Sequence, residues 1–197
     1  MKKNMKFEIP CVILSGGKSS RMGKDKSLLP FGGFPTLAEY QYNRLTKLFE
    51  NVYISCKEDS KFGFEAQFIR DDSSIFAPSV GIKQAFNALK SKEIFFITID
   101  TPFLRESTIM LLVQSARENP DSHAVLIQSG EKRHYLLGIY RSAILPKIKH
   151  HLAEKNYKIS ALLCENYTKY ITLQESDEFC NLNTQAEYEH ALGLGLF

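Results

Sequence analysis

Hydrophobic residues along the chain follow two patterns that alternate. Short runs of consecutive apolar residues are typical of strands buried on both faces of a sheet. They occur at 11–14, 52–55, 68–69, 94–99, 124–127, 135–140 and 170–173. Longer stretches with apolar residues at helical spacing separate most of them, at 36–49, 79–89, 106–117, 143–164 and from 184 onward. This alternation predicts an α/β fold of three layers around a mixed, mostly parallel sheet.

Two of the expected helices begin with a capping box, in which a Thr and a Glu three residues later satisfy each other's backbone N–H groups. Thr36 precedes Glu39, and Thr184 precedes Glu187. The chain has no internal repeat and no linker-like tract, and 197 residues suffice for one hydrophobic core. We therefore expect a single domain over residues 1–197.

Composition narrows the function classes. The net charge of +3 is too small to indicate nucleic-acid binding, and the N-terminal apolar run at 9–14 is too short for a signal peptide or a membrane span. The four cysteines are scattered and form no CxxC pair, which does not favour a zinc site or a disulfide framework. We expect a cytoplasmic protein with no nucleic-acid or membrane partner.

Polar residues follow several of the expected strands. In open α/β sheets, ligands bind beyond the carboxyl ends of the strands. That rule predicts a site built from the glycine-rich loop 15–33 and from polar residues near strand ends: Ser55, Asp71, Asp100, Asn181 and Asn183.

The loop after the first strand has the composition that a triphosphate requires. Between Ser15 and Lys26 lie four cations and one anion, Asp25. Glycines such as Gly16 and Gly17 let backbone N–H groups approach an anion closely. Lys and Arg side chains can neutralise the charge of a leaving pyrophosphate. The alternative interpretation is a solvated basic loop without a ligand.

Two common phosphate motifs are excluded by spacing. A Walker A loop requires Gly-x4-Gly-Lys-Ser/Thr, but Gly17 and Gly23 are one residue too far apart, and Asp25 follows Lys24. The dinucleotide fingerprint GxGxxG does not occur. A P-loop hydrolase and a Rossmann dehydrogenase are therefore disfavoured.

Three motifs together resemble a known family. Residues 14–29 read Leu-Ser-Gly-Gly-x3-Arg-Met-Gly-x-Asp-Lys-x-Leu-Leu, residues 99–103 read Ile-Asp-Thr-Pro-Phe, and residues 181–184 read Asn-Leu-Asn-Thr. Their sequence and order are similar to those of the molybdenum cofactor guanylyltransferases, members of a wider nucleotidyltransferase group. The resemblance covers nearly the whole chain and implies the Rossmann-like nucleotidyltransferase fold.

The resemblance also implies a reaction and a site. The reaction would transfer GMP from Mg²⁺-bound GTP to molybdenum-bound molybdopterin and release pyrophosphate. Arg21 and Lys26 would hold phosphates, Asp100 would bind Mg²⁺, and Asn181 and Asn183 would lie near the metal or the pterin phosphate. The nucleotide would contact Leu14, Ser15, Gly16, Gly17, Lys26, Ser55, Asp71 and Asp100. Transient contacts with cofactor-synthesis proteins and molybdoenzymes would follow.

Several alternatives stay open. The protein could be a sister nucleotidyltransferase that uses CTP, or one that uses a sugar phosphate or an alcohol phosphate as acceptor. It could also be a non-catalytic nucleotide-binding protein that delivers the cofactor. Ser55 stands where relatives often have Asn, and the turn at 77–82 is shorter than theirs. Asp71 could form a plain Asx turn, and Asn181 and Asn183 could only shape the last helix. The basic run 132–134 could clamp an acidic acceptor or form a solvated hairpin.

Overall fold

One seven-stranded sheet organises the protein. The computed structural model describes residues 6–16, 25–163 and 167–193. The strands are β1 (Cys11–Leu14), β2 (Val52–Cys56), β3 (Gln67–Arg70), β4 (Glu93–Thr98), β5 (Ala124–Ser129), β6 (Lys132–Arg141) and β7 (Thr168–Leu173). Their spatial order is β3-β2-β1-β4-β6-β5-β7, and only β6 is antiparallel to its neighbours in this sheet. The prediction of a mixed, mostly parallel sheet is confirmed.

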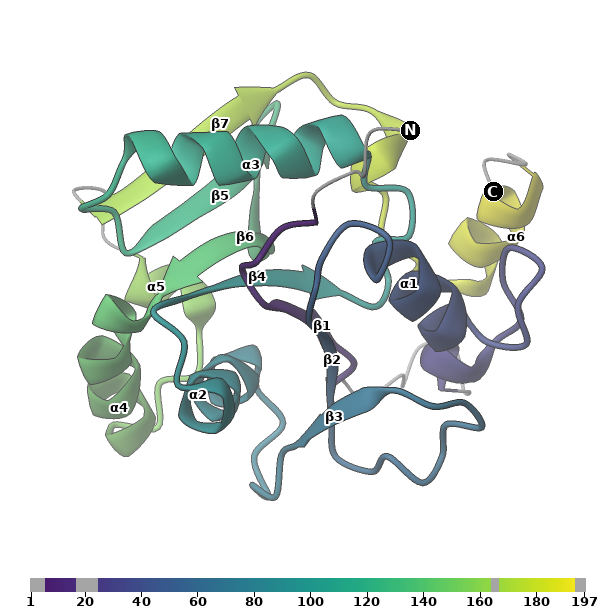
Figure 1. Cartoon of the computed structure of the whole chain (residues 1–197), viewed down its shortest axis with the longest axis horizontal. Helices are drawn as coiled ribbons and strands as arrows, with labels where there is room; N and C mark the ends of the chain where they lie inside the picture. The colour runs from purple at the N-terminus through teal and green to yellow at the C-terminus, as the bar shows by residue number, and fades with distance from the viewer. Residues whose placement is uncertain (1–5, 17–24, 164–166, 194–197) are drawn as a thin grey trace.

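Helices cover both faces of the sheet (Figure 1). The helices are α1 (Leu37–Leu45), α2 (Pro78–Leu89), α3 (Glu106–Glu118), α4 (Leu145–Ala153), α5 (Ile159–Leu162) and α6 (Gln185–Gly193). Alternate residues of β1 separate the two cores: Cys11 and Ile13 join the core under α1, α3 and α6, whereas Val12 and Leu14 join the core under α2, α4 and α5. The predicted three-layer α/β fold is confirmed.

The capping box of α6 forms in full, and at α1 the hydrogen bond to the Thr36 side chain forms. The Thr36 side chain accepts a hydrogen bond from the Glu39 backbone N–H at 3.1 Å. At α6, Thr184 Oγ1 accepts from the Glu187 N–H at 3.2 Å, and Glu187 Oε2 accepts from the Thr184 N–H at 2.8 Å. Because these bonds satisfy N–H groups that lack an intrahelical partner, each cap determines where its helix begins.

The strand β6 begins earlier than the sequence pattern indicates. It starts at Lys132 instead of residue 135, so the basic run belongs to a strand that pairs with β5. The pairing shifts between Leu126 and Ile127, and Gly138 next to this irregularity has a φ of +149°. A Cβ atom at Gly138 would lie 2.2 Å from the Val125 carbonyl oxygen, so this position requires glycine.

Within the described ranges, the helices are too short or too polar to cross a membrane. A single domain over 1–197 stays a prediction, and the continuous sheet supports it.

Candidate active site

The carboxyl ends of β1, β2 and β4 meet at one edge of the sheet and form a pocket there. Ser15 N–H donates to the Ser55 carbonyl at 2.9 Å, and Ile99 N–H donates to the Leu14 carbonyl at 3.1 Å. We call this cavity the base pocket; its volume is about 160 Å³. Its lining is mainly apolar and comprises Leu14, Gly16, Ser55, Cys56, Lys57, Asp71, Phe76, Ala77, Pro78, Gly81, Thr98 and Leu136.

The first turn of α2 closes one side of the base pocket. Pro78 occupies the start of the helix, and its N-cap residue Ala77 supplies no side-chain hydrogen bond. The Val80 N–H donates to the Ala77 carbonyl at 3.0 Å, so backbone hydrogen bonds close this turn without a side-chain cap. A Cβ atom at Gly81 would lie 3.3 Å from Leu14 Cδ2, so glycine lets the helix pack closely on the end of β1.

Asp71 forms the Asx turn that its sequence context suggested and also pairs with a lysine. Its Oδ1 accepts from the Ser73 N–H at 3.0 Å, and its Oδ2 lies 2.8 Å from Lys57 Nζ. The Lys57 ammonium group also donates to the carbonyl oxygens of Ser73 and Ile75. Lys57 was not singled out from the sequence, although it follows β2 directly.

A second group of polar residues converges beside the base pocket. Lys26 Nζ donates to Asp100 Oδ2 and, at 3.1 Å, to Asn183 Oδ1. The Leu182 N–H donates to the Asp100 carbonyl at 2.9 Å, which fixes the Asn183 segment against the end of β4. Three residues from distant parts of the chain thus form what we call the polar cluster: Lys26, Asp100 and Asn183.

Asp25 holds the lysine of the polar cluster in place. It caps the short 3₁₀ helix η1 (Lys26–Leu28): its Oδ1 accepts from the Ser27 N–H at 3.0 Å, and its Oδ2 pairs with Lys61 at 2.6 Å. Burial opposes ionisation of Asp25, but hydrogen bonds from Lys61 and Ser27 outweigh it and lower the pKa of this carboxyl group. Asp25 therefore stays ionised and anchors the 3₁₀ helix that carries Lys26.

The chemistry of Asp100 fits a divalent cation. Its Oδ1 atom is buried and finds no hydrogen-bond partner among the described residues. A buried carboxylate oxygen without a partner is costly unless a cation or another donor satisfies it. In the described part of the chain, no group of three or more His, Cys, Asp or Glu residues could hold a metal. Mg²⁺ does not require such a group, since it binds one or two carboxylates together with substrate phosphates.

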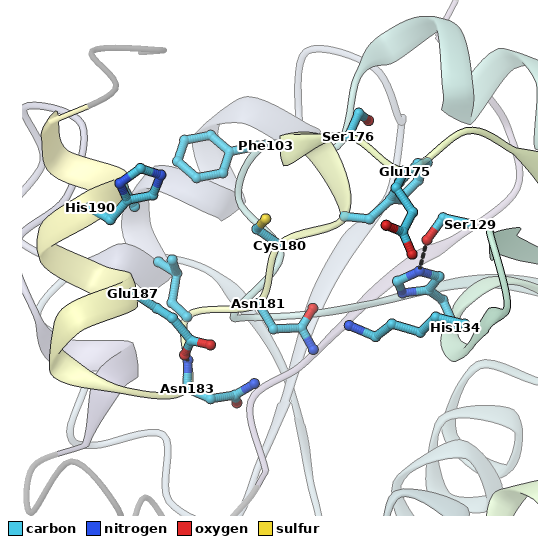
Figure 2. A pocket seen from close by; sticks show the side chains of 14 residues that line it. Phe103, Ser129, His134, Glu175, Ser176, Cys180, Asn181, Asn183, Glu187 and His190 are labelled. Carbon is cyan, nitrogen blue, oxygen red and sulfur yellow. Dashed lines mark hydrogen bonds between the residues drawn. The ribbon is translucent and has the colours of Figure 1, made fainter.

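A second pocket opens beside Asn183 (Figure 2). We call it the acceptor pocket; its volume of about 300 Å³ reaches the range of small-molecule sites. Its residues come from the adjoining ends of β5 and β6, from the segment between β7 and α6, from α6 itself and from the loop after β4. They are Phe103, Ser129, Lys132, His134, Glu175, Ser176, Phe179, Cys180, Asn181, Leu182, Asn183, Glu187, His190 and Ala191.

Residues 132–134 lie in a β5–β6 hairpin with Lys132 and Arg133 exposed, as one interpretation expected, but His134 differs from both interpretations. Its side chain is buried, lies against Phe179 and hydrogen bonds with Ser129 Oγ at 2.7 Å. Burial, assisted by the charge of Lys132, lowers the pKa of His134 to about 4. His134 is thus neither solvated nor a cation at neutral pH, and only the exposed residues Lys132 and Arg133 carry charge.

The structure places the sequence-predicted residues that it describes in three sets. Leu14, Gly16, Ser55 and Asp71 line the base pocket, whereas Lys26, Asp100 and Asn183 form the polar cluster, and Asn181 lines the acceptor pocket. The Ser15 hydroxyl is buried without a partner in the described ranges. Gly17 and Arg21 lie outside the described residues. Lys57, Ser129 and Glu175 line these pockets without belonging to a recognisable sequence motif, so the sequence did not predict them.

Known proteins resemble this chain in sequence and in fold. The MobA-like NTP transferase domain model matches residues 11–167. The molybdenum cofactor guanylyltransferase of Helicobacter pylori strain J99 is 36% identical over 197 residues, covering 98% of this chain and 92% of that protein. The enzyme of the same name from Campylobacter jejuni strain RM1221 is 33% identical over 184 residues, covering 92% and 94%.

Solved structures agree on the fold. Molybdopterin-guanine dinucleotide biosynthesis protein A from Archaeoglobus fulgidus superposes with a TM-score of 0.80 at 20% identity, covering 94% of this chain and 98% of that chain. At this identity the likeness concerns the fold alone. Together with the family match and the full-length relatives, it shows that the chain belongs to the MobA-like NTP transferase family and is a nucleotidyltransferase.

Proposed function

We propose that this protein transfers GMP from Mg²⁺-bound GTP to the terminal phosphate of molybdenum-bound molybdopterin, with release of pyrophosphate. The names of the full-length relatives support the guanylyl branch. The observation that carries the proposal is the position of the polar cluster. Thr98, two residues before Asp100, lines the base pocket, and Asn183 lines the acceptor pocket. A nucleotide and an acceptor would therefore meet at Lys26, Asp100 and Asn183.

The reaction requires charge neutralisation more than proton transfer. A phosphate oxygen of the acceptor forms a bond to the α-phosphorus of GTP, and the bond from that phosphorus to the β-phosphate oxygen breaks. Pyrophosphate leaves with the electron pair. Since the attacking phosphate is already ionised at neutral pH, no strong base is needed, and alignment of two anions is the main task.

The residues of the polar cluster suit this task. Lys26 would exchange its contact with Asp100 for phosphate oxygens, and Asn183 would orient the acceptor phosphate. Asp100 would hold Mg²⁺ through its partnerless Oδ1 atom, and the bound ion would supply charge neutralisation at the phosphates. The main chain of Ser15, Gly16 and Gly17 would contact the base and the sugar, and Arg21 would hold phosphates together with Lys26.

The proposed reaction also implies a cellular location and a set of partners. We infer a cytoplasmic protein of one domain that works without nucleic acid or membrane. Transient contacts with cofactor-synthesis proteins and molybdoenzymes would deliver the substrate and receive the product.

Isothermal titration of the protein with GTP, CTP and UTP in the presence of Mg²⁺ tests the proposal. We expect GTP to bind at least about tenfold tighter than the other two, a difference of about 1.4 kcal/mol. Tighter binding of CTP would move the protein to a sister branch. GTP binding without Mg²⁺-dependent pyrophosphate release in the presence of molybdopterin would favour a cofactor-delivery protein.

A further inference from the structure

The segment between β3 and α2 forms a wall of the base pocket, and a single ammonium group organises it. Lys57 Nζ contacts three oxygen atoms of this segment: Asp71 Oδ2 at 2.8 Å, the Ile75 carbonyl at 3.0 Å and the Ser73 carbonyl. Two of these contacts are hydrogen bonds to carbonyl oxygens, and the third is an ion pair with the Asp71 carboxylate. The ammonium group of Lys57 is therefore directed at the wall.

The wall consists of consecutive turns that share Lys57 as their centre. Asp71 Oδ1 accepts from the Ser73 N–H at 3.0 Å, and Ser73 Oγ accepts from the Ile75 N–H at 3.1 Å. Such side-chain turns are weak when isolated and exposed. Here two of the carbonyl oxygens that they present point at one cation, which gives the segment a defined conformation.

Lys57 also places an aromatic ring at the pocket. Phe76 is 57% exposed, lines the base pocket and lies with its ring centroid 4.8 Å from Lys57 Nζ. This distance is within the range of a cation–π interaction. A half-exposed ring fixed beside an apolar pocket offers a planar surface to a nucleobase.

We propose that Lys57 is the positioning residue for nucleobase selection: it holds residues 71–76 as one wall of the base pocket, and Asp71 acts on the base through this wall. Asp71 Oδ1 accepts a hydrogen bond from the Ser73 N–H, and Asp71 Oδ2 forms an ion pair with Lys57. Both contacts hold the carboxylate within the wall. The proposal rests on the proposed function only in naming guanine as the base.

The test measures triphosphate selectivity in four proteins: the parent, Lys57→Met, Asp71→Asn and the double variant. Affinities for GTP, CTP and UTP are determined by titration with Mg²⁺. We expect Lys57→Met to weaken binding of the preferred triphosphate about tenfold and to lower its preference over the others. The double variant should lose no more affinity for the preferred triphosphate than the weaker-binding single variant, because both substitutions open the same wall. The exposed Lys47→Met is the matched control and should keep the parent's preference.

Three results would overturn the role of Lys57: an unchanged preference, an equal loss for all three triphosphates, or additive losses in the double variant. An equal loss of affinity for all three triphosphates would indicate that Lys57 contacts a phosphate. Additive losses of affinity in the double variant would indicate that Asp71 reads the base itself. If Lys57→Met folds poorly, Lys57→Arg carries the test. The planar guanidinium group of arginine keeps the charge but cannot direct its donors at all three of these oxygens. The preference for one triphosphate should therefore still fall. A parent-like preference in Lys57→Arg would then overturn the proposal.

The two proposals fail separately. A parent protein that prefers CTP would contradict guanylyl transfer. The role of Lys57 would then be tested by whether Lys57→Met loses the preference for CTP. A parent with no preference would contradict both.

Discussion

At the scale of single residues, the two oxygen atoms of Asp100 have different environments. Oδ2 accepts from Lys26, whereas Oδ1 is buried without a partner in the part of the chain that the structure describes. Both observations suit a carboxylate that binds a cation when the nucleotide arrives. Asp100 is thus the residue whose loss should affect turnover most directly.

We predict that Asp100→Ala lowers Mg²⁺-dependent pyrophosphate release by at least about 100-fold, since it removes electrostatic stabilisation at the reacting phosphates. The folded state should persist, which a thermal melt followed by circular dichroism would check. Asp121→Ala, at an exposed turn, serves as the control and should keep full activity. Normal turnover in a folded Asp100→Ala protein would remove Asp100 from the metal site.

His134 gives a second prediction at this scale. Its pKa is about 4 in the folded protein against an ordinary value of 6.5, so between these values the unfolded chain binds a proton that the folded protein does not. The free energy of unfolding should therefore fall as the pH drops from about 6.5 to about 4. In His134→Gln, urea denaturation should show a shallower fall over this window than in the parent.

The exposed His150→Gln is the control for His134, and its stability should follow the parent's pH dependence. Parallel curves for the parent and His134→Gln would show that His134 protonates equally in the folded and unfolded states.

At the scale of elements, the segment before α6 stabilises a helix that is distant in sequence. The N-cap residue of α3, Arg105, makes no side-chain hydrogen bond at its own helix start. The buried Glu178 replaces that cap: its Oε2 accepts from the Arg105 N–H at 3.1 Å and from Thr108 Oγ1 at 2.8 Å. A carboxylate at this position also interacts favourably with the positive end of the helix dipole.

We predict that Glu178→Ala lowers the free energy of unfolding by about 1–3 kcal/mol, because two buried donors lose their acceptor. Chemical denaturation measures the change. Glu118→Ala, at the exposed C-terminal end of α3, should stay within about 0.5 kcal/mol of the parent. Equal stability of both variants would mean that solvent caps α3 without Glu178.

At the scale of the whole molecule, the fold forms two separate pockets. The base pocket and the acceptor pocket share no lining residue. Under the proposed function, the nucleotide and the acceptor would bind at the same time, and the phosphate of the acceptor would attack the nucleotide directly.

This arrangement predicts a sequential mechanism. Initial rates measured over a grid of GTP and molybdopterin concentrations should give intersecting lines in double-reciprocal plots. Parallel lines would instead indicate a covalent nucleotidyl-enzyme intermediate. The acceptor pocket would then have to be reassigned.

The sequence by itself predicted the features that depend on near neighbours in the chain. The strand at Cys11–Leu14, the capping box of α6 and the Thr36 cap of α1 form as expected, since hydrophobic pattern and local hydrogen bonds suffice for them. The motifs also identified Lys26, Asp100 and Asn183, and the strand-end rule explained why they should meet. Their meeting is now visible as direct contacts across 74 and 157 positions of sequence.

Only the tertiary structure decided the features that depend on burial and on convergent contacts. The neutral state of His134 arises because β6 begins at Lys132 and carries the ring into the core beside Phe179. Lys57 gains its role because a segment 14 to 18 residues later folds its oxygens around one ammonium group. Local sequence does not encode either environment, because desolvation and hydrogen-bond saturation are set by the packing of distant elements.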